Sequence, residues 1–227
     1  GTFTKEHDQA IDYGIDFYAP QTVLTPDGRR VMTGWMQNWD ACNLRAPEEK
    51  WLGQMSLPRE LFLKDGRLYQ RPVKELDEMR RNKVEYHNVT FSDVISLNGI
   101  QGRKVDLELT LRPGEGGKLY QKFALRFAQN EKYQTAISFR PHESVLKIDR
   151  KFSGSRRAII HQRRSLVNSK NGELKLRVIL DRFSVEAFVN DGEQVMTATM
   201  YTDQSADGIS FFADGVVNMD VVKYDLV

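Results

Sequence analysis

The sequence has a single cysteine, Cys42, and only four histidines, at scattered positions. One cysteine excludes an internal disulfide and a multi-cysteine metal site, and the histidines lack the spacing of metal ligands. No apolar run approaches the roughly 18 residues that cross a bilayer, and the first residues do not resemble a signal peptide. The 33 Lys and Arg residues against 31 Asp and Glu give a net charge of +2, too small for an electrostatic nucleic-acid binder. We therefore expect no metal, no cofactor, no nucleic-acid partner and no membrane partner.

What the chain does have is length, an apolar fraction of 40% and a strong alternation of apolar and polar residues over its 227 positions. Alternation with a period of two is typical of half-buried antiparallel strands. The clearest runs are Lys104–Arg112, Leu174–Leu180 and Phe183–Val189, and Asp191–Gly192 then turns the chain into a further strand. About ten to twelve such strands recur from residue 83 to residue 227, at intervals of roughly 8–12 residues. This spacing predicts a two-sheet β-sandwich over 83–227.

The first 71 residues are organised differently. They predict a small up-and-down sheet whose strands are Ile15–Leu24, Arg29–Met36, Leu52–Leu57 and the hairpin of Arg59–Leu63 with Arg67–Gln70. A single sheet of this kind has no second layer to cover its apolar faces, so it is the sort of unit that stacks with other blades in a β-propeller. We expect residues 1–71 to form one blade of a partial propeller, and to expose apolar side chains that further blades would cover: Phe17, Val23, Leu24, Val31 and Met32.

Only one segment predicts a helix. Pro72–Arg81 begins with proline and places Val73, Leu76 and Met79 on one face. Its short length and its position between the two sheet regions indicate a connector. We therefore assign residues 72–82 to a linker helix.

Two segments near the N-terminus combine aromatic and polar side chains, Asp12–Gln21 and Gly34–Asp40. Flat rings beside a few hydrogen-bonding groups suit a sugar, which is amphipathic in the same way. The rings and polar groups in question belong to Tyr18, Trp35, Trp39, Asp16, Gln37, Asn38 and Asp40. Aromatic residues on adjacent strands are also common in the core of a sheet, so core packing and a ligand surface are both open interpretations.

Five segments resemble glycoside hydrolase family 32, the family of invertases, sucrose-6-phosphate hydrolases, levanases and inulinases. They are DYGIDFYAPQT (Asp12–Thr22), GWMQNW (Gly34–Trp39), SLPREL (Ser56–Leu61), DGRLYQRPVKEL (Asp65–Leu76) and LDRFSVEAFVNDGE (Leu180–Glu193), in the order of the family. The resemblance implies the last blade of a five-bladed β-propeller, a short linker helix and a two-sheet β-sandwich. It also implies a parent protein that hydrolyses sucrose, sucrose 6-phosphate or fructans with retention.

A retaining glycosidase needs two carboxyl groups about 5–5.5 Å apart. The family carries its acidic residues in Asn-Asp-Pro-Asn, Arg-Asp-Pro and Glu-Cys motifs, and none of the three occurs here. Trp35–Asn38 echoes the first motif without a carboxylate, and Cys42 follows Ala41 instead of glutamate. We expect the chain to be the C-terminal portion of such an enzyme, without catalytic residues and inactive alone.

The resemblance further implies that Tyr18 and Trp39 line the rim of the fructose pocket and that Asp16 reaches a sugar hydroxyl. Packing between blades is the alternative for these residues. Two other carboxylates, Glu60 and Glu186, alternate with apolar neighbours, and we expect each to face solvent or to pair with a nearby arginine such as Arg59 or Arg182. Neither is expected to be catalytic.

The expected partners are a fructose-containing sugar, bound through the parent active site, the missing N-terminal propeller blades and a second copy in a homo-oligomer. The sandwich is expected to stabilise the propeller or to mediate dimerisation, and a carbohydrate-binding β-sandwich module is the alternative function. The basic pairs Arg156–Arg157 and Arg163–Arg164 fit a solvated strand face. The unpaired cysteine favours a bacterial cytoplasm over secretion.

Overall fold

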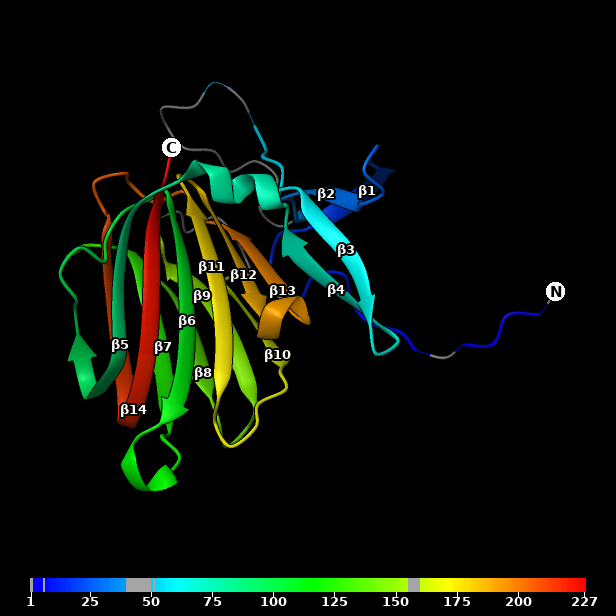
Figure 1. Ribbon diagram of the computed structural model, residues 1–227. Helices are drawn as coiled ribbons and strands as arrows, with labels where there is room; N and C mark the ends of the chain where they lie inside the picture. Colours follow the sequence, from blue (N-terminus) through cyan, green and yellow to red (C-terminus); the bar gives the residue numbers. More distant parts are fainter. Residues whose placement is uncertain (1, 6, 40–49, 51, 155–159) are drawn as a thin grey trace.

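The structure is a computed structural model that describes residues 2–5, 7–39, 50, 52–154 and 160–227. Within these ranges the fold is all-β, and it consists of a four-stranded and a ten-stranded antiparallel sheet (Figure 1). Its helical elements are short 3₁₀ turns, and no helix in the described part of the chain is long and apolar enough to cross a membrane.

The small sheet resembles one propeller blade. Its strands follow chain order and are β1 (Tyr18–Leu24), β2 (Arg30–Trp35), β3 (Arg59–Lys64) and β4 (Arg67–Pro72). The strand predicted over Leu52–Leu57 is wrong, because only an isolated bridge joins Met55 to Trp35 there. Gly53 has a φ of +86°, which interrupts the extended conformation. The other predicted strands of this region are confirmed within a few residues.

The predicted linker helix is a 3₁₀ helix, η2 (Lys74–Met79), instead of an α-helix over Pro72–Arg81. Pro72 still belongs to β4, and Arg80 is already extended as the first residue of the next strand. Seven residues, 73–79, lie between the two strands, and a 3₁₀ helix spans such a gap with its longer rise per residue. Leu76 is the buried side chain of this element.

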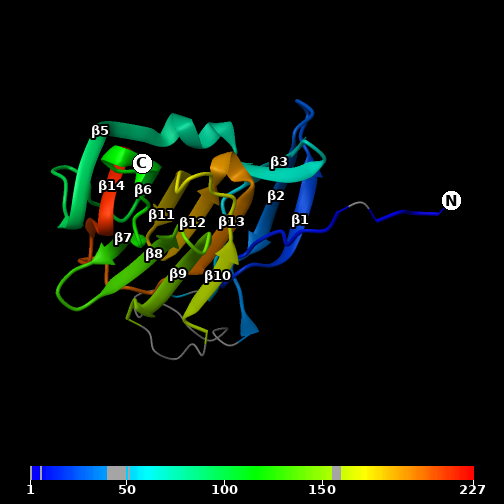
Figure 2. The ribbon, with the colours of Figure 1, turned by 90° about the horizontal axis from the view of Figure 1, so that it is seen from below.

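The large sheet contains the ten strands β5 (Arg80–Ile95), β6 (Val105–Pro113), β7 (Lys122–Gln129), β8 (Gln134–Arg140), β9 (Val145–Phe152), β10 (Gln162–Leu166), β11 (Leu174–Asp181), β12 (Ser184–Val189), β13 (Gln194–Thr199) and β14 (Gly208–Leu226). Their order is β10-β9-β8-β7-β14-β6-β11-β12-β13, and β5 pairs with β14. Two separate hydrogen-bonded sheets were predicted, whereas one continuous sheet curls so that its halves lie over one another (Figures 1 and 2).

The curl depends on β14, which belongs to both halves. Its first part, up to Asp214, pairs with β7, and its second part, from Val217, pairs with β6. The register with β5 shifts between Ala213 and Val217, at Gly215, whose φ is +93°. A bulge with a glycine in the left-handed region bends a strand strongly, so the sheet folds back at this point.

The two halves bury one continuous hydrophobic core between them. On β6 the predicted alternation is confirmed, because Val105, Leu107, Leu109 and Leu111 are all buried. The other half contributes aromatic and aliphatic side chains to the same cluster, among them Phe123, Leu125, Phe139 and Ile148.

Candidate functional site

Tyr18 and Trp39, the two predicted rim residues, lie together. Their ring centroids are 5.4 Å apart at an interplanar angle of 72°, an edge-to-face arrangement. Tyr18 is 45% exposed and Trp39 is 67% exposed. Tyr18 begins β1, the outer strand of the blade, and every residue of that strand is exposed. The pair therefore presents aromatic surface at the free edge of the small sheet.

Asp16 lies in the contact between the blade and the large sheet. It is 1% exposed, and its Oδ2 accepts hydrogen bonds from the backbone N–H of Thr199 at 2.6 Å and from the Thr199 hydroxyl at 2.9 Å. The same oxygen forms an ion pair with Arg150, and Oδ1 accepts a hydrogen bond from Asn38. Both carboxylate oxygens are thus engaged by protein groups, three of them contributed by the large sheet.

A second buried ionic cluster surrounds Arg59 on β3. Its guanidinium donates to Oε2 of Glu186 on β12, from Nη2 at 2.6 Å and from Nε at 2.9 Å, and to Oδ2 of Asp12 at 3.0 Å. The Thr197 hydroxyl lies 2.6 Å from both Arg59 Nη2 and Asp12 Oδ2. Arg59 is fully buried and its centre lies 4.6 Å from the centroid of the Phe17 ring, which covers it.

Of the two alternatives predicted for Glu186 and Glu60, solvent exposure or pairing with an arginine, the structure shows pairing. Glu186 is 2% exposed because it neutralises Arg59, and Glu60 is buried beside Arg71, with Oε1 2.7 Å from the guanidinium. The predicted arginine pairing is therefore present for both, with partners that lie across a sheet or an interface. Glu186 pairs with Arg59 and not with Arg182, its neighbour in sequence.

Asp12 and Glu186 have raised pKa values, as catalytic acids often do, but a substrate cannot reach their carboxyl groups. Burial raises the pKa of the Asp12 carboxyl and the pKa of the Glu186 carboxyl above their ordinary values, and the shared Arg59 opposes that rise. Two carboxyl groups with one guanidinium leave an excess negative charge in a sealed site, which disfavours the second ionisation. Both side chains are almost fully shielded from solvent, so the cluster is a structural joint between the blade and the large sheet.

The segment before β1 extends this joint. The backbone N–H groups of Tyr13 and Ile15 donate to the carbonyls of Val195 and Thr197 on β13, at 2.8 and 2.7 Å. A Cβ at Gly14 would lie 2.1 Å from the backbone nitrogen of Thr197, so only glycine permits this approach. Sequence reasoning missed Arg150 and Thr199 as partners of Asp16, because no local pattern links residues more than 130 positions apart.

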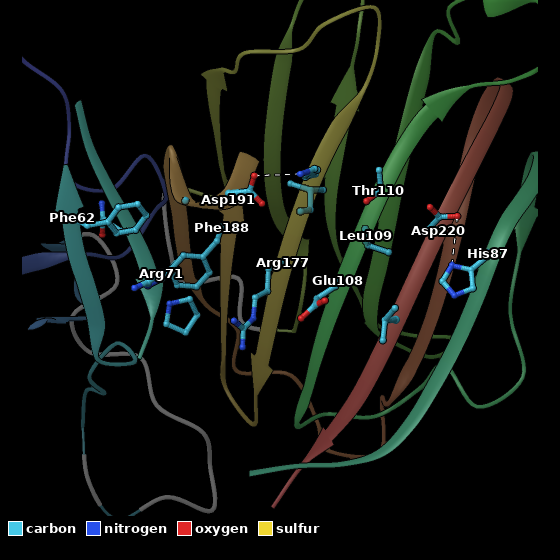
Figure 3. A pocket seen from close by; sticks show the side chains of 16 residues that line it. Phe62, Arg71, His87, Glu108, Leu109, Thr110, Arg177, Phe188, Asp191 and Asp220 are labelled. Atoms are coloured by element: carbon cyan, nitrogen blue, oxygen red, sulfur yellow. Dashed lines mark hydrogen bonds and ion pairs between the residues drawn. The ribbon is translucent and has the colours of Figure 1, made fainter. Parts of the chain in front are cut away.

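A groove lies on the other side of the blade, between β3–β4 and the outer face of the large sheet (Figure 3). Its volume is about 600 Å³. One wall comes from Phe62 and Arg71 of the blade, and the floor comes from outward-facing side chains of β6, β11 and β14, such as Thr110 and Arg177. His87 on β5 lies at the far end.

Four residues named in the sequence analysis lie outside the described residues: Asp40, Cys42, Arg156 and Arg157. Arg163 and Arg164 are exposed on β10, as the prediction of a solvated strand face requires. Among the described residues, no cluster of three His, Cys, Asp or Glu side chains could hold a metal ion.

The exposed apolar surface predicted for the blade is present in part. Val23 and Leu24 on β1 are 59% and 58% exposed. Met32 on β2 is buried, contrary to the prediction, and Phe17 and Val31 are half-buried. Part of the surface that further blades were expected to cover is thus buried within this chain, and among the described residues no strand pairs with the outer edge of β1.

Two family models match the chain and divide it where the structure does. A model described as glycosyl hydrolases family 32 C terminal matches residues 75–226, and one described as the family 32 N-terminal domain matches residues 1–72. The sucrose-6-phosphate hydrolase of Staphylococcus xylosus is 33% identical over 217 residues, which are 95% of this chain and 43% of that protein.

Solved structures agree with this assignment. The sucrose-6-phosphate hydrolase of Lactobacillus gasseri superposes with a TM-score of 0.81 at 27% identity, covering 98% of this chain and 44% of that one. Fructan 1-exohydrolase IIa of Cichorium intybus, solved in complex with 1-kestose, shares the fold with a TM-score of 0.82 at 22% identity, covering 96% of this chain and 49% of that one. The chain thus spans less than half the length of these proteins. It belongs to glycoside hydrolase family 32.

Proposed function

We propose that this chain is the C-terminal portion of a β-fructofuranosidase-type hydrolase, which cleaves sucrose, sucrose 6-phosphate or a fructan with retention of configuration. The single observation that carries the proposal is the match of two consecutive family 32 models, which meet at residues 72–75, over both sheets of one chain. In this proposal the chain alone is inactive, and its large sheet forms the β-sandwich that stabilises the propeller.

We expect the chain alone to lack hydrolytic activity because it has no suitable pair of catalytic carboxyl groups. The sequence lacks the Asn-Asp-Pro-Asn, Arg-Asp-Pro and Glu-Cys motifs of the family. Asp12 and Glu186, the two acids that share the buried Arg59, are sealed from solvent, so no sugar oxygen can approach them. A retaining mechanism needs one carboxylate as nucleophile and a second as acid and base, both open to the substrate.

We propose that Tyr18 and Trp39 contribute to the rim of the fructose pocket. Their exposed edge-to-face pair lies at the open edge of the blade, where a neighbouring blade would complete a cavity. An aromatic pair of this kind offers an apolar face to the C–H groups of a sugar ring. Asp16 acts on the sugar only indirectly in this proposal, because its carboxylate holds Asn38 and Arg150.

Fructose release by the purified chain tests the proposal. Sucrose, sucrose 6-phosphate, inulin and levan are incubated with the chain, and reducing sugar is measured against a heat-treated sample. We expect no release above that blank. Turnover of any of the four would show that the chain holds a working nucleophile and acid, and would overturn the proposal that it is inactive alone.

A further inference from the structure

A small pocket on the outer face of the large sheet has no part in the function proposed above. Its polar lining comes from four adjacent strands, β7 to β10, and from the turn between β8 and β9: Lys122, Ser138, Arg140, Glu143, Lys147 and Arg164. The two halves of the sheet enclose the core, and the blade contacts the outer face of the other half, where Arg59 pairs with Glu186 of β12. We propose that this basic pocket, on the far side of the sheet from the blade, binds a phosphoryl group, either as free phosphate or as the phosphate monoester of a small molecule.

Strand pairing brings the lining side chains together. Lys147 on β9 is the register partner of both Ser138 on β8 and Arg164 on β10. Residues paired in this way share one face of the sheet, with Cβ atoms about 4.5–5.5 Å apart. Lys122 and Arg140 lie next to the outermost register pair of β7 with β8. Four cations from four neighbouring strands thus line one pocket, together with the Ser138 hydroxyl.

The lining of the pocket is strongly basic. Its four cationic side chains face one carboxylate, that of Glu143, which leaves a formal charge of +3. Arg140 pairs with Glu143 at 3.1 Å, and Lys147 pairs with Asp149 at 2.8 Å. Within the described part of the chain, Lys122 and Arg164 form no ion pair. Two positive charges therefore remain for an anionic ligand.

The electrostatic surroundings of Lys122 agree with this count. Burial lowers the pKa of the Lys122 ammonium group, and the nearby cations Lys147, Arg140 and Arg126 lower it further, whereas Asp149 raises it. Like charges disfavour the charged form of such a group, and an anion at the same place would favour it. A negatively charged ligand in the pocket would therefore relieve the repulsion among these side chains.

Ser138 supplies a buried hydroxyl to the pocket. The residue is 6% exposed, and among the residues that the structure describes its hydroxyl has no hydrogen-bond partner. Most buried side-chain hydroxyls in proteins do have one. Because Ser138 lines the pocket, this hydroxyl can donate to a ligand that lies there.

These side chains suit a phosphoryl group. Ammonium, guanidinium and hydroxyl groups all donate hydrogen bonds, and a phosphoryl group carries three strongly accepting oxygens. The volume of the pocket is about 30 Å³, which is more than the roughly 10–15 Å³ that one water molecule needs. Pockets for a whole small molecule start at about 300 Å³. The basic pocket therefore holds the anionic group alone, and the rest of a monoester extends into solvent.

Calorimetric titration of the intact chain with inorganic phosphate, glucose 6-phosphate and glucose, all at one ionic strength, tests the proposal. Ser138→Ala removes the hydroxyl without changing the charge, and Arg164→Gln removes one cation that has no ion pair. Arg163→Gln is the matched control, because it makes the same change at the preceding residue of β10, which is also exposed but does not line the pocket. Near-ultraviolet circular dichroism of each variant reports whether it is folded.

We expect saturable binding of phosphate or glucose 6-phosphate and no binding of glucose. Arg164→Gln is expected to weaken this binding about tenfold, as the loss of a hydrogen bond to a charged group does, and Ser138→Ala about fivefold. Arg163→Gln is expected to leave it unchanged. Tighter binding of glucose 6-phosphate would support the site and identify a monoester as its ligand, whereas tighter binding of inorganic phosphate would support it as a site for the free ion.

Three results would overturn the proposal. The first is the absence of saturable binding by both phosphates. The second is equal weakening by Arg163→Gln and Arg164→Gln while Ser138→Ala has no effect, because that pattern is diffuse attraction to a basic surface. The third is binding that neither Ser138→Ala nor Arg164→Gln changes, because the phosphate then binds elsewhere.

Discussion

Arg59 of the blade and Glu186 of the large sheet form an ion pair at 2.6 Å, with neither side chain more than 3% exposed. Asp12 completes the cluster from the segment that precedes the blade. A buried ion pair contributes little net stability compared with apolar side chains, but breaking it leaves a charge without a partner in a sealed site. The relative position of the two sheets therefore depends on these three residues.

Replacing Arg59 by methionine is expected to destabilise the chain by about 3–5 kcal/mol, because two buried carboxylates lose their cation. Arg71→Met is the matched control. Arg71 also pairs with a buried glutamate, but its own side chain is 57% exposed, so we expect a loss of at most about 1 kcal/mol. Urea unfolding followed by fluorescence and by far-ultraviolet circular dichroism measures both. Similar losses in the two variants would contradict the role of Arg59 as the joint.

Two carboxyl groups share the single cation of Arg59, and we therefore expect the free energy of unfolding to depend on pH. The pKa of Glu186 is raised in the folded chain above its ordinary 4.5, chiefly by burial. A carboxyl group with a raised folded pKa stabilises the fold below its unfolded pKa, and this contribution is lost as the pH rises through the folded pKa. Glu186→Gln cannot ionise. The free energy of unfolding of the wild type minus that of the variant is therefore expected to fall as the pH rises above the ordinary pKa of 4.5. A difference that grows with pH would contradict the raised pKa.

The contact of the turn η4 (Asn190–Gly192) with β4 can be tested with two glycines that share a backbone conformation. Gly192 has a φ of +97° and no space for a Cβ beside Gln70, whereas Gly66 has a φ of +73° and nothing within 4 Å. Alanine at either position bears the strain of the left-handed region, about 1 kcal/mol or more. Only Gly192→Ala also forces the backbone of β4 away at Gln70, so we expect it to be the more destabilising variant in thermal unfolding. Equal shifts in melting temperature would mean that η4 can move away from β4 without a loss of stability.

The exposed edge of β1 predicts self-association. All seven residues of this strand are exposed, including Val23 and Leu24, and a free strand edge with apolar side chains can pair with another chain. Val23→Lys places a charge on this edge, which opposes such pairing. Sedimentation velocity over a range of concentrations is expected to show oligomers in the wild type and fewer in Val23→Lys. A wild type that stays monomeric at all concentrations would contradict this expectation.

Much of the fold is predictable from the sequence because alternation is a local signal. On β6 the period of two determines which face is buried, and Val105, Leu107, Leu109 and Leu111 follow it. Local signals also misled, at the strand predicted over Leu52–Leu57 and at the linker helix. The apolar spacing of Val73, Leu76 and Met79 fits an α-helix, but strands on both sides leave room only for η2.

The joint between the sheets could not be predicted from the sequence, since it depends on pairs far apart in the chain. Glu186 lies in a strand whose alternation places it opposite to the core, which normally means solvent. Here the blade covers that face, and Arg59 lies 127 positions away from Glu186 in the sequence. The aromatic pair of Tyr18 and Trp39 was identified by its composition, whereas its geometry required the structure.

Native-state hydrogen exchange of the intact chain tests the central claim, that the blade and the large sheet form one structural unit. The joint at Arg59 predicts that amides of β3 and β12 open in the same transition, with free energies of opening within about 1 kcal/mol of each other, while β1 exchanges faster at its free edge. If the β3 amides exchange as fast as those of β1 while β12 stays protected, the blade opens on its own and the claim is wrong.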